Sequence, residues 1–452
     1  MKRKPSISFI LSALLLLTAC LTFAGVSQKP EGRLYAGTAR VDITPPIGIN
    51  LAGYEPRAKL GSASVHDSLS AKILVLEAGG ERLAIITCDL IFFYNKQVLD
   101  RIHEKYGITR VLIPFSHTHS GPVLEDSNEY SGFVAQAMVD GVGTALSRMF
   151  PARISATVRS FPQLGYNRMT NKTDLIAMWQ NYERIPYGPV DPEVGVIKVE
   201  DDQGNPRAIL MQYACHPVTN GHNMDISADY PGVAVKKVEE AFGRQVMCMF
   251  VQGGAGDINP MFMTGKSGFM DYSNEKIYNP PTDYSQMEKM GTLLADEVIR
   301  AANGMAPCPD AKASITAMAD SMKFTGRFRK DLVFDIHITT VLINGQIAIA
   351  AFPGEPFVAY QLFWKANAAV AHPFFFGYTF SSGGTHPGYL CDIRSAAHGG
   401  YEVDASPDVI EVGSGEIIMN RHLINLYRMK GLMRDTPLTI GQILESMSSE
   451  KK

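Results

Sequence analysis

An apolar run that ends at two histidines, Arg110–Val123 (RVLIPFSHTHSGPV), constrains the fold of this chain more than any other stretch. Its first part, Val111–Phe115, has the length and apolar character of a buried strand. Residues 120–122, SGP, then turn the chain away. If strand geometry continues through this run, its period of two places His117 and His119 on one side. Two imidazoles beside a Gly-Pro turn favour metal binding or acid–base chemistry.

Two further strand-like runs end at side chains that can bind a metal. Ala208–Tyr213 leads into His216, and Ile347–Phe352 leads into Glu355. Ligands of open α/β sheets bind outside the carboxyl ends of the strands. We therefore expect these two residues to meet His117, because such ligands need only be close in space. Two histidines and one glutamate form a known catalytic zinc set that leaves a position for water.

A glycine-rich loop, GGAGDINP at residues 253–260, follows the strand-like run Val246–Val251. The loop lacks the Gly-Lys-Ser/Thr sequence of a phosphate-binding loop. Its glycines instead favour a close approach of the backbone to a ligand. Asp257 in this loop either supports the site from behind or caps the loop.

Helix and strand patterns interleave along the rest of the chain. Helix candidates cover residues 96–106, 132–149, 231–242 and 285–303. Hairpin signals appear at residues 78–80 (AGG) and at residues 344–345 (NG). This mixture predicts an α/β fold with mixed β-sheets layered with helices, not a purely parallel sheet. The even composition, without a Pro/Ser-rich linker, favours one large unit or two fused halves.

Charge and cysteine content narrow the class of protein. The 452 residues carry a net charge of −3 and no basic cluster, which argues against nucleic acid as a partner. Besides Cys20 there are five cysteines, an odd number, and no CxxC motif, so a full disulfide framework is not expected.

The first residues have the pattern of an export signal. Three basic residues at positions 2–4 precede the apolar stretch Ile7–Ala19. The sequence LTAC at residues 17–20 resembles a bacterial lipoprotein cleavage box, with Cys20 as the lipidated residue. The alternatives are a plain signal peptide cut near residues 24–25 or an uncleaved anchor. We expect an exported protein of the bacterial cell envelope that is held to the membrane by an N-terminal lipid anchor.

Several other residues lie near these motifs without a motif of their own. His222, His386 and His398 occupy neighbouring loops and are candidates for lining a pocket. Asp229 precedes a predicted helix, which is typical of a residue in the N-cap region. The run Phe374–Phe376 is interpreted as a core strand.

Taken in order, these motifs resemble the catalytic N-terminal domain of the neutral/alkaline non-lysosomal ceramidase family. The matching blocks, within residues 37–405, are VDITPPIGINLAGY, SHTHSGP, YNR, CHP, GGAGDINP, FPGE and GYLCDIRSAAHGGYE. Together with the export signal, the resemblance divides the chain into a lipoprotein-type signal peptide at residues 1–20, an exposed leader at 21–33, a ceramidase-like catalytic domain at 34–440 and a tail at 441–452, of which the catalytic domain is what the resemblance implies.

The resemblance also implies a zinc ion, Zn²⁺, held by four residues of this chain. These are His117, His216, Glu355 and Tyr389, the tyrosine of GYL. The protein would then hydrolyse the amide bond of an N-acyl substrate, a small molecule or a lipid, with metal-activated water. His119 would line the site and move a proton to the leaving amine.

Three more site residues follow from the resemblance. Arg168 of YNR and Tyr401 of GGYE match active-site residues that stabilise the oxyanion or hold a polar group of the substrate. The spacing 401 − 389 = 12 fits the family's spacing of its two tyrosines. Asn259 replaces a serine of the family, and its amide could donate a hydrogen bond to a developing oxyanion.

Two other functions remain compatible with the sequence. One is a lipid-anchored binding protein with a degenerate site, which the replacement of serine by Asn259 favours. The other is a zinc esterase that acts on acylated sugars. The presence of a residue at all four zinc positions favours the amidohydrolase.

Overall fold

The computed structural model of the chain describes residues 32–54, 59–95, 97–124, 129–161, 164–169, 184–186, 188–243, 245–263, 283–306, 312–384, 386–404, 406, 408–434 and 436–449. The predicted signal segment with Cys20 lies outside the described residues, as does most of the leader. Within the described ranges, no helix has both the length and the apolar character that crossing a membrane requires.

The larger of two main sheets has eight strands in the order β11-β9-β8-β6-β1-β3-β4-β5. Its strands are β1 (Leu34–Asp42), β3 (Ser70–Ala78), β4 (Glu81–Cys88), β5 (Arg110–Leu112), β6 (Phe150–Ser160), β8 (Glu193–Asp201), β9 (Pro206–Tyr213) and β11 (Met247–Gln252). The interior pairs are antiparallel, whereas the pairs at both edges, β11–β9 and β4–β5, are parallel.

The smaller main sheet has four strands in the order β13-β14-β15-β17. Its strands are β13 (Ile315–Thr325), β14 (Val333–Ile343), β15 (Ile347–Ala351) and β17 (His372–Phe376). The pair β15–β17 is parallel and the other two pairs are antiparallel. Both sheets therefore contain parallel and antiparallel pairs, which confirms the predicted α/β fold with mixed sheets.

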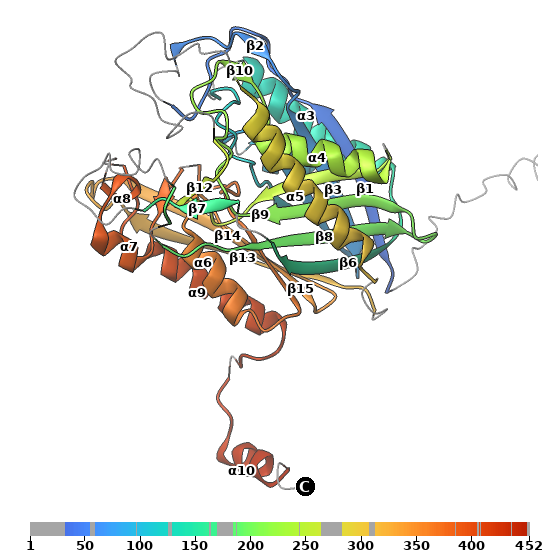
Figure 1. Cartoon of the computed structure of the whole chain (residues 1–452). Helices are drawn as coiled ribbons and strands as arrows, with labels where there is room; N and C mark the ends of the chain where they lie inside the picture. Colours follow the sequence, from blue (N-terminus) through green and yellow to red (C-terminus); the bar gives the residue numbers. More distant parts are fainter. Residues whose placement is uncertain are drawn as a thin grey trace, which may run out of the picture.

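The two sheets pack face to face, and helices cover their outer faces (Figure 1). The helices over the larger sheet are α2 (Gln97–Tyr106), α3 (Glu129–Ser147), α4 (Asp229–Phe242) and α5 (Ser285–Asn303), and those over the smaller sheet are α6 (Val358–Asn367) and α9 (Ser414–Met429). Side chains alternate along β3: Leu74 belongs to the core between the two sheets, which includes Phe374, and Ile73 belongs to the core under α3, which includes Val134.

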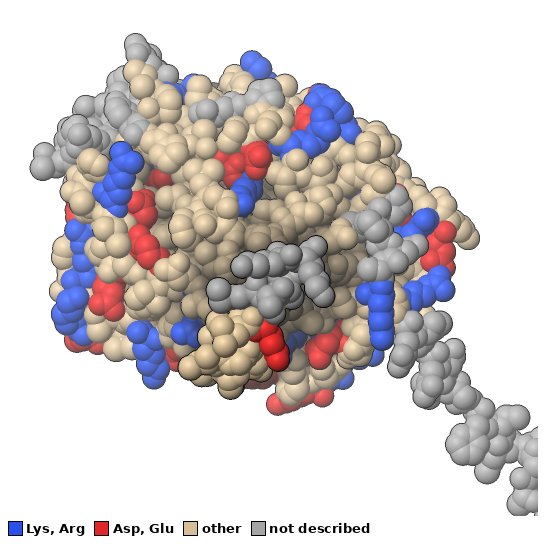
Figure 2. All heavy atoms as spheres, turned by 90° about the horizontal axis from the view of Figure 1, so that it is seen from below, with Lys and Arg blue, Asp and Glu red and all other residues tan. Residues whose placement is uncertain are grey.

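Short elements complete the fold and frame the site described below. They are β2 (Ser64–Val65), β7 (Gly165–Asn167), β10 (Asp225–Ile226), β12 (Ile258–Pro260), β16 (Glu355–Pro356), β18 (Tyr389–Leu390), α7 (Ile393–His398), α8 (Tyr401–Asp404) and α10 (Ile440–Ser449). In Figure 1, α10 stands apart from the layers at the C-terminal end. Lysine, arginine and acidic residues are interspersed on the face in Figure 2.

Most predicted elements are confirmed, with small shifts at their ends. The helix expected at residues 132–149 is α3, and the one expected at 231–242 is α4. The Asn344-Gly345 turn joins β14 to β15 with φ of 52° and 68°, the left-handed geometry of a tight hairpin. The core strand predicted at Phe374–Phe376 is fully buried in β17.

One expectation about strand geometry is wrong. β5 ends at Leu112, so its alternation does not continue to the two histidines. Beyond it, Pro114 and Phe115 make only isolated bridges to neighbouring segments. His117 then adopts a left-handed backbone with φ of 67°. The histidines therefore converge because of a loop that is pinned by its neighbours, and not because of a strand.

Candidate functional site

Loops from both main sheets supply the side chains of the candidate site. His117 lies beyond β5, and His216 follows β9, both in the larger sheet. Glu355 lies in β16, just beyond β15 of the smaller sheet. Backbone hydrogen bonds from Phe115 to Tyr378 (3.1 Å) and from Gly377 to Gln252 (3.0 Å) join these strand ends. The site therefore sits at the seam where strands of the two sheets end together.

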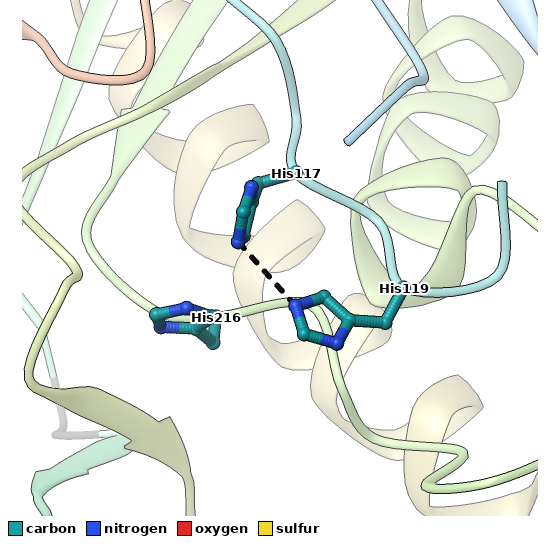
Figure 3. Close-up of side chains that lie close together, drawn as sticks. All are labelled: His117, His119 and His216. Carbon is teal, nitrogen blue, oxygen red and sulfur yellow. Dashed lines mark hydrogen bonds between the residues drawn. The ribbon is translucent and has the colours of Figure 1, made fainter. Parts of the chain in front are cut away.

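Three imidazoles meet in this seam (Figure 3). His117 and His119 come from one loop, and their Nε2 atoms lie 3.3 Å apart. One ligand atom from each of His117, His119 and His216 lies within 4.8 Å of the others. His117 and His216 are 1% and 0% exposed and so are shielded from bulk water, whereas His119 is partly exposed.

Glu355 joins this cluster through one oxygen. Its Oε2 lies 3.3 Å from Nε2 of His117 and 3.3 Å from Nε2 of His216. The carboxylate thus faces the same atoms that would coordinate a metal. We predicted from the ends of strand-like runs that His117, His216 and Glu355 would meet. The structure brings these three residues together, although the first and the last are more than 200 positions apart in the sequence.

The other ring nitrogens of the two buried histidines point at backbone carbonyls. Nδ1 of His117 lies 3.2 Å from the carbonyl oxygen of Ile91, and Nδ1 of His216 lies 2.6 Å from that of Ala255. Because a carbonyl only accepts, Nδ1 carries the proton and donates it. Nε2 is then left with its lone pair, which is the arrangement that metal-binding histidines adopt.

The start of α4 holds the His216 loop on both sides. The hydroxyl of Tyr230 donates to the carbonyl of Cys215 at 2.7 Å. Asp229 accepts from the Thr219 hydroxyl at 2.6 Å and has a left-handed backbone, φ 58°. Burial raises the pKa of Asp229 to about 6. Asp229 therefore begins the helix, as its sequence context indicated, but it also anchors the loop that carries His216, which the sequence analysis missed.

Tyr389 lies directly across from Glu355. The two residues are partners in the parallel β16–β18 pair, which fixes their backbones side by side. Nη2 of Arg168 donates to the Tyr389 hydroxyl at 3.0 Å. The ring of Tyr401, at the start of α8, lies 6.2 Å from the ring of Tyr389 in an edge-on arrangement. The two tyrosines paired by the sequence resemblance are therefore neighbours in space.

Arg168 is the centre of a buried polar network. Its Nε donates to Glu402 at 2.6 Å, its Nη1 donates to Asn259 at 2.8 Å, and its Nη2 donates to the Gly256 carbonyl at 3.0 Å. Despite burial, Tyr389 and Glu402 raise the pKa of the Arg168 guanidinium well above its usual range. A permanently charged Arg168 therefore contacts both the Glu402 carboxylate and the Tyr389 hydroxyl.

Burial and neighbouring charge set the protonation of the remaining groups. Burial, with Arg168 adding to it, lowers the pKa of His216 to about 4, so this imidazole is neutral at pH 7. Burial favours a protonated Glu355, but His117 and His216 outweigh it and hold the pKa of Glu355 well below its usual range. Burial raises the pKa of Asp257 to about 7. Neutral imidazole and ionised carboxylate are the forms that bind a metal.

The donor set fits zinc better than a hard cation. Buried imidazoles with a carboxylate are typical zinc ligands, whereas calcium and magnesium prefer oxygen ligands. The Nε2 lone pairs are oriented by the carbonyls behind the rings, and the carboxylate is ionised. The side chains present are therefore suited to hold a zinc ion without rearranging their outer hydrogen bonds.

Comparison with models of protein families relates this chain to a known family. The family model described as neutral/alkaline non-lysosomal ceramidase, N-terminal, matches residues 34–277, more than half of the chain. The chain belongs to this family. All eight site residues carried over from the ceramidase motifs are in described parts of the chain and lie in or beside the seam.

Curated ceramidases align with part of this chain. Neutral ceramidase A of Dictyostelium discoideum is 25% identical over 299 residues, which cover 57% of this chain and 41% of that protein. Neutral ceramidase 3 of Arabidopsis thaliana is 29% identical over 201 residues, 39% of this chain and 26% of that protein. The chain thus matches well under half the length of these relatives.

Solved ceramidase structures share the fold. The neutral ceramidase from Pseudomonas aeruginosa superposes with a TM-score of 0.70 at 16% identity and covers 90% of this chain and 76% of that chain. A ceramidase complexed with C2 gives a TM-score of 0.71 at 15% identity, covering 90% and 77%. These matches extend the shared fold beyond residue 277, over nearly the whole chain.

The three candidate pocket histidines differ in their positions. His222 packs on Tyr54, with ring centres 4.1 Å apart, and Tyr54 in turn contacts His119. His386 packs on Phe92, a neighbour of His117, and burial lowers its pKa to about 4. His398 is exposed and lines a separate cavity of about 340 Å³.

One aromatic neighbour of the site was missed by the sequence analysis. Tyr378 has a left-handed backbone, φ 54°, and its ring centre lies 4.5 Å from that of His117. It follows a predicted core strand, and no motif distinguishes it. Its contact with the site is seen only in the structure, where Tyr378 and His117 both have a left-handed backbone and their rings lie side by side.

Proposed function

We propose that this protein is a zinc-dependent hydrolase that cleaves the amide bond of an N-acyl substrate. The observation that carries the proposal is the convergence of Nε2 of His117 and Nε2 of His216 on Glu355 Oε2, each at 3.3 Å. Both rings donate from Nδ1 to backbone carbonyls, so both Nε2 atoms are available. Membership of the ceramidase family supports amide hydrolysis as the reaction class.

His117, His216 and Glu355 would hold the metal, with Tyr389 as a fourth ligand. Zinc in such a donor set supplies Lewis-acid polarisation and a source of activated water. Tyr389 is suited to this position because Arg168 donates to its hydroxyl oxygen, which offsets the cost of losing the phenolic proton. Burial and Glu355 act in the opposite direction and raise the pKa of Tyr389.

The remaining residues would handle protons and bind the substrate. His119 lies 3.3 Å from His117, within reach of a group held beside it, and we assign it the transfer of a proton to the leaving amine. Tyr401, next to Tyr389, would donate to the oxygen on which negative charge develops. Arg168 and Asn259 would support the side of the site that Tyr389 and Tyr401 form.

The substrate class follows from the family rather than from the site alone. The relatives are named neutral ceramidases, so we propose an acyl amide of a lipid amine as the substrate. We also propose that the protein is exported and held at the bacterial cell envelope through Cys20, where such a lipid is accessible. Residues 34–440 would form the catalytic domain.

The test is turnover of a substrate panel by zinc-loaded protein. The panel contains N-acylsphingosines of several acyl lengths, N-acetylated sugars and their O-acyl counterparts, with Glu355→Gln as the control. We expect release of the free amine from an N-acyl substrate and little activity in the control. Denaturing mass spectrometry during turnover should detect no acyl adduct. A trapped acyl-enzyme, or turnover of esters only, would contradict the proposal.

A further inference from the structure

Asn259 lies in the short β7–β12 ladder, and Arg168 directly follows β7. Asn259 lies opposite Tyr166, and Arg168 follows Tyr166 by two residues. Asn259 is 1% exposed and Arg168 is 3% exposed. Nη1 of Arg168 donates to Oδ1 of Asn259 at 2.8 Å. A guanidinium has donors only, so this contact requires that the amide oxygen, and not the amide nitrogen, faces Arg168.

The other end of the Asn259 amide is also engaged. Burial raises the pKa of Tyr166, and a hydrogen bond from the Asn259 side chain to its hydroxyl opposes that rise. The amide therefore bridges two neighbours, with its oxygen on Arg168 and its nitrogen on Tyr166. The amide oxygen accepts from Arg168 and one of the two Nδ2 hydrogens is directed to Tyr166, so most of this side chain's hydrogen-bonding capacity serves protein groups.

The guanidinium of Arg168 is nearly saturated. Of its five N–H groups, Nε–H reaches Glu402, one on Nη1 reaches Asn259, and two on Nη2 reach Gly256 and Tyr389. One N–H of Nη1 remains. Arg168 is therefore built mainly to hold protein groups, and Tyr389 is the one among them that faces Glu355 across the β16–β18 pair.

We infer that Asn259 is a positioning residue that holds the Arg168 guanidinium in the orientation from which Nη2 donates to Tyr389. The inference rests on the proposed function, in which Tyr389 is a zinc ligand. Asn259 then acts on zinc affinity through Arg168, without touching the substrate. A serine at this position would hold its hydroxyl oxygen closer to the backbone than the amide oxygen with which Asn259 accepts from Arg168.

A double-mutant cycle on zinc affinity tests this chain of contacts. Asn259→Leu keeps the volume and removes the acceptor, and Arg168→Met removes the guanidinium. We expect each single variant to bind zinc about 10-fold more weakly, the lower end of the range for groups behind a metal ligand. The double variant should be no weaker than Arg168→Met. Losses that multiply, or an unchanged affinity in Asn259→Leu, would overturn the inference.

Two controls separate this effect from a general loss of folding. Asn259→Asp keeps an oxygen toward Arg168 and should retain the zinc affinity of the wild type. Asn425→Leu removes a buried amide on α9, which donates to Asp320 at 2.6 Å, and should lower stability without changing zinc affinity. Zinc loss in Asn425→Leu equal to that in Asn259→Leu would contradict a specific role for Asn259.

A measurement on zinc-free protein distinguishes failure of this inference from failure of the proposed function. Nitrogen-15 NMR of arginine side chains reports how slowly the Arg168 N–H protons exchange. Asn259→Leu should accelerate the exchange at least about 10-fold, because one hydrogen bond that restrains rotation is gone. An unchanged rate rejects the inference alone. Wild-type protein that binds no zinc, yet has the accelerated exchange in Asn259→Leu, rejects the proposed function alone.

Discussion

At the scale of single residues, Gly53 shows how tightly the position of His119 is determined. Gly53 has φ of 92°, and a Cβ built on it would lie 2.4 Å from Cγ of the His119 ring. No side chain fits there unless the imidazole moves. The absence of a side chain at Gly53 therefore leaves the space that the His119 ring occupies. The rings of the two buried histidines are held instead by hydrogen bonds to backbone carbonyls.

Gly53→Ala should separate proton transfer from metal binding. The new methyl group displaces His119, so turnover should fall on the order of 100-fold, as expected for losing a general acid. Zinc content should stay at the wild-type level, because His117, His216 and Glu355 are unaffected. Steady-state kinetics with elemental analysis measures both quantities.

Gly48→Ala is the matched control for this variant. Gly48 has φ of 91°, so it imposes the same backbone strain, but nothing lies within 4 Å of its added Cβ. It should retain wild-type turnover. If Gly53→Ala instead lost its zinc together with its activity, His119 would be a metal ligand and not a proton carrier.

Site residues that follow a long apolar strand could be predicted from the sequence, whereas the other site residues could not. His216 and Glu355 follow apolar strands, so their meeting with His117 was predictable from the rule that strand ends converge. Arg168 directly follows a strand of three residues and Tyr389 lies on a strand of two, and both strands are too short to have a periodic pattern. They were found only through the family resemblance. Asp229 acts through tertiary contacts that no local signal encodes.

At the scale of elements, α9 packs on the smaller sheet through a buried histidine. His422 is 0% exposed, and its Nδ1 lies 2.8 Å from the Thr340 hydroxyl of β14. Burial lowers the pKa of His422 to about 3. In the unfolded chain the same group has a pKa near 6.5. Between these two values the unfolded state binds a proton that the folded state does not.

His422 should therefore make the protein less stable in acid. Its contribution is fully present above pH 6.5 and is lost as the pH falls from 6.5 toward 3, at about 1.4 kcal/mol per pH unit for one proton. Urea unfolding between pH 4 and 7.5 should give a shallower slope for His422→Phe than for the wild type. His103→Gln, at an exposed histidine of α2, is the control and should keep the wild-type slope. Equal slopes in His422→Phe and wild type would contradict the assignment.

At the scale of the whole molecule, the site depends on how two sheets are stacked. Its two buried histidines come from loops of the eight-stranded sheet, and Glu355 lies in β16, just beyond β15 of the four-stranded sheet. The sequence predicted mixed sheets with helices, and this is confirmed. It did not predict that the strands form two sheets packed face to face, because pairing between distant strands is not encoded in local periodicity.

The location of the molecule is a separate prediction at this scale. If Cys20 is lipidated, the protein should partition with the membrane fraction after cell disruption. Cys20→Ser should release it to the soluble fraction or leave the precursor uncleaved, because the acyl chains provide the anchoring energy. Immunoblotting of the fractions, with Cys88→Ser at a buried cysteine as the control, measures this. Normal processing and unchanged fractionation of Cys20→Ser would contradict lipidation.

Zinc stoichiometry tests the metal site itself most directly. Purified protein, dialysed against metal-free buffer after zinc loading, should retain one zinc per chain. His117→Ala, His216→Ala and Glu355→Ala should each lose most of it, since three remaining ligands hold zinc poorly. Tyr389→Phe should lose less, because a phenol is a weaker ligand than an imidazole, and His103→Gln should lose none. Full zinc content in all three ligand variants would contradict the site.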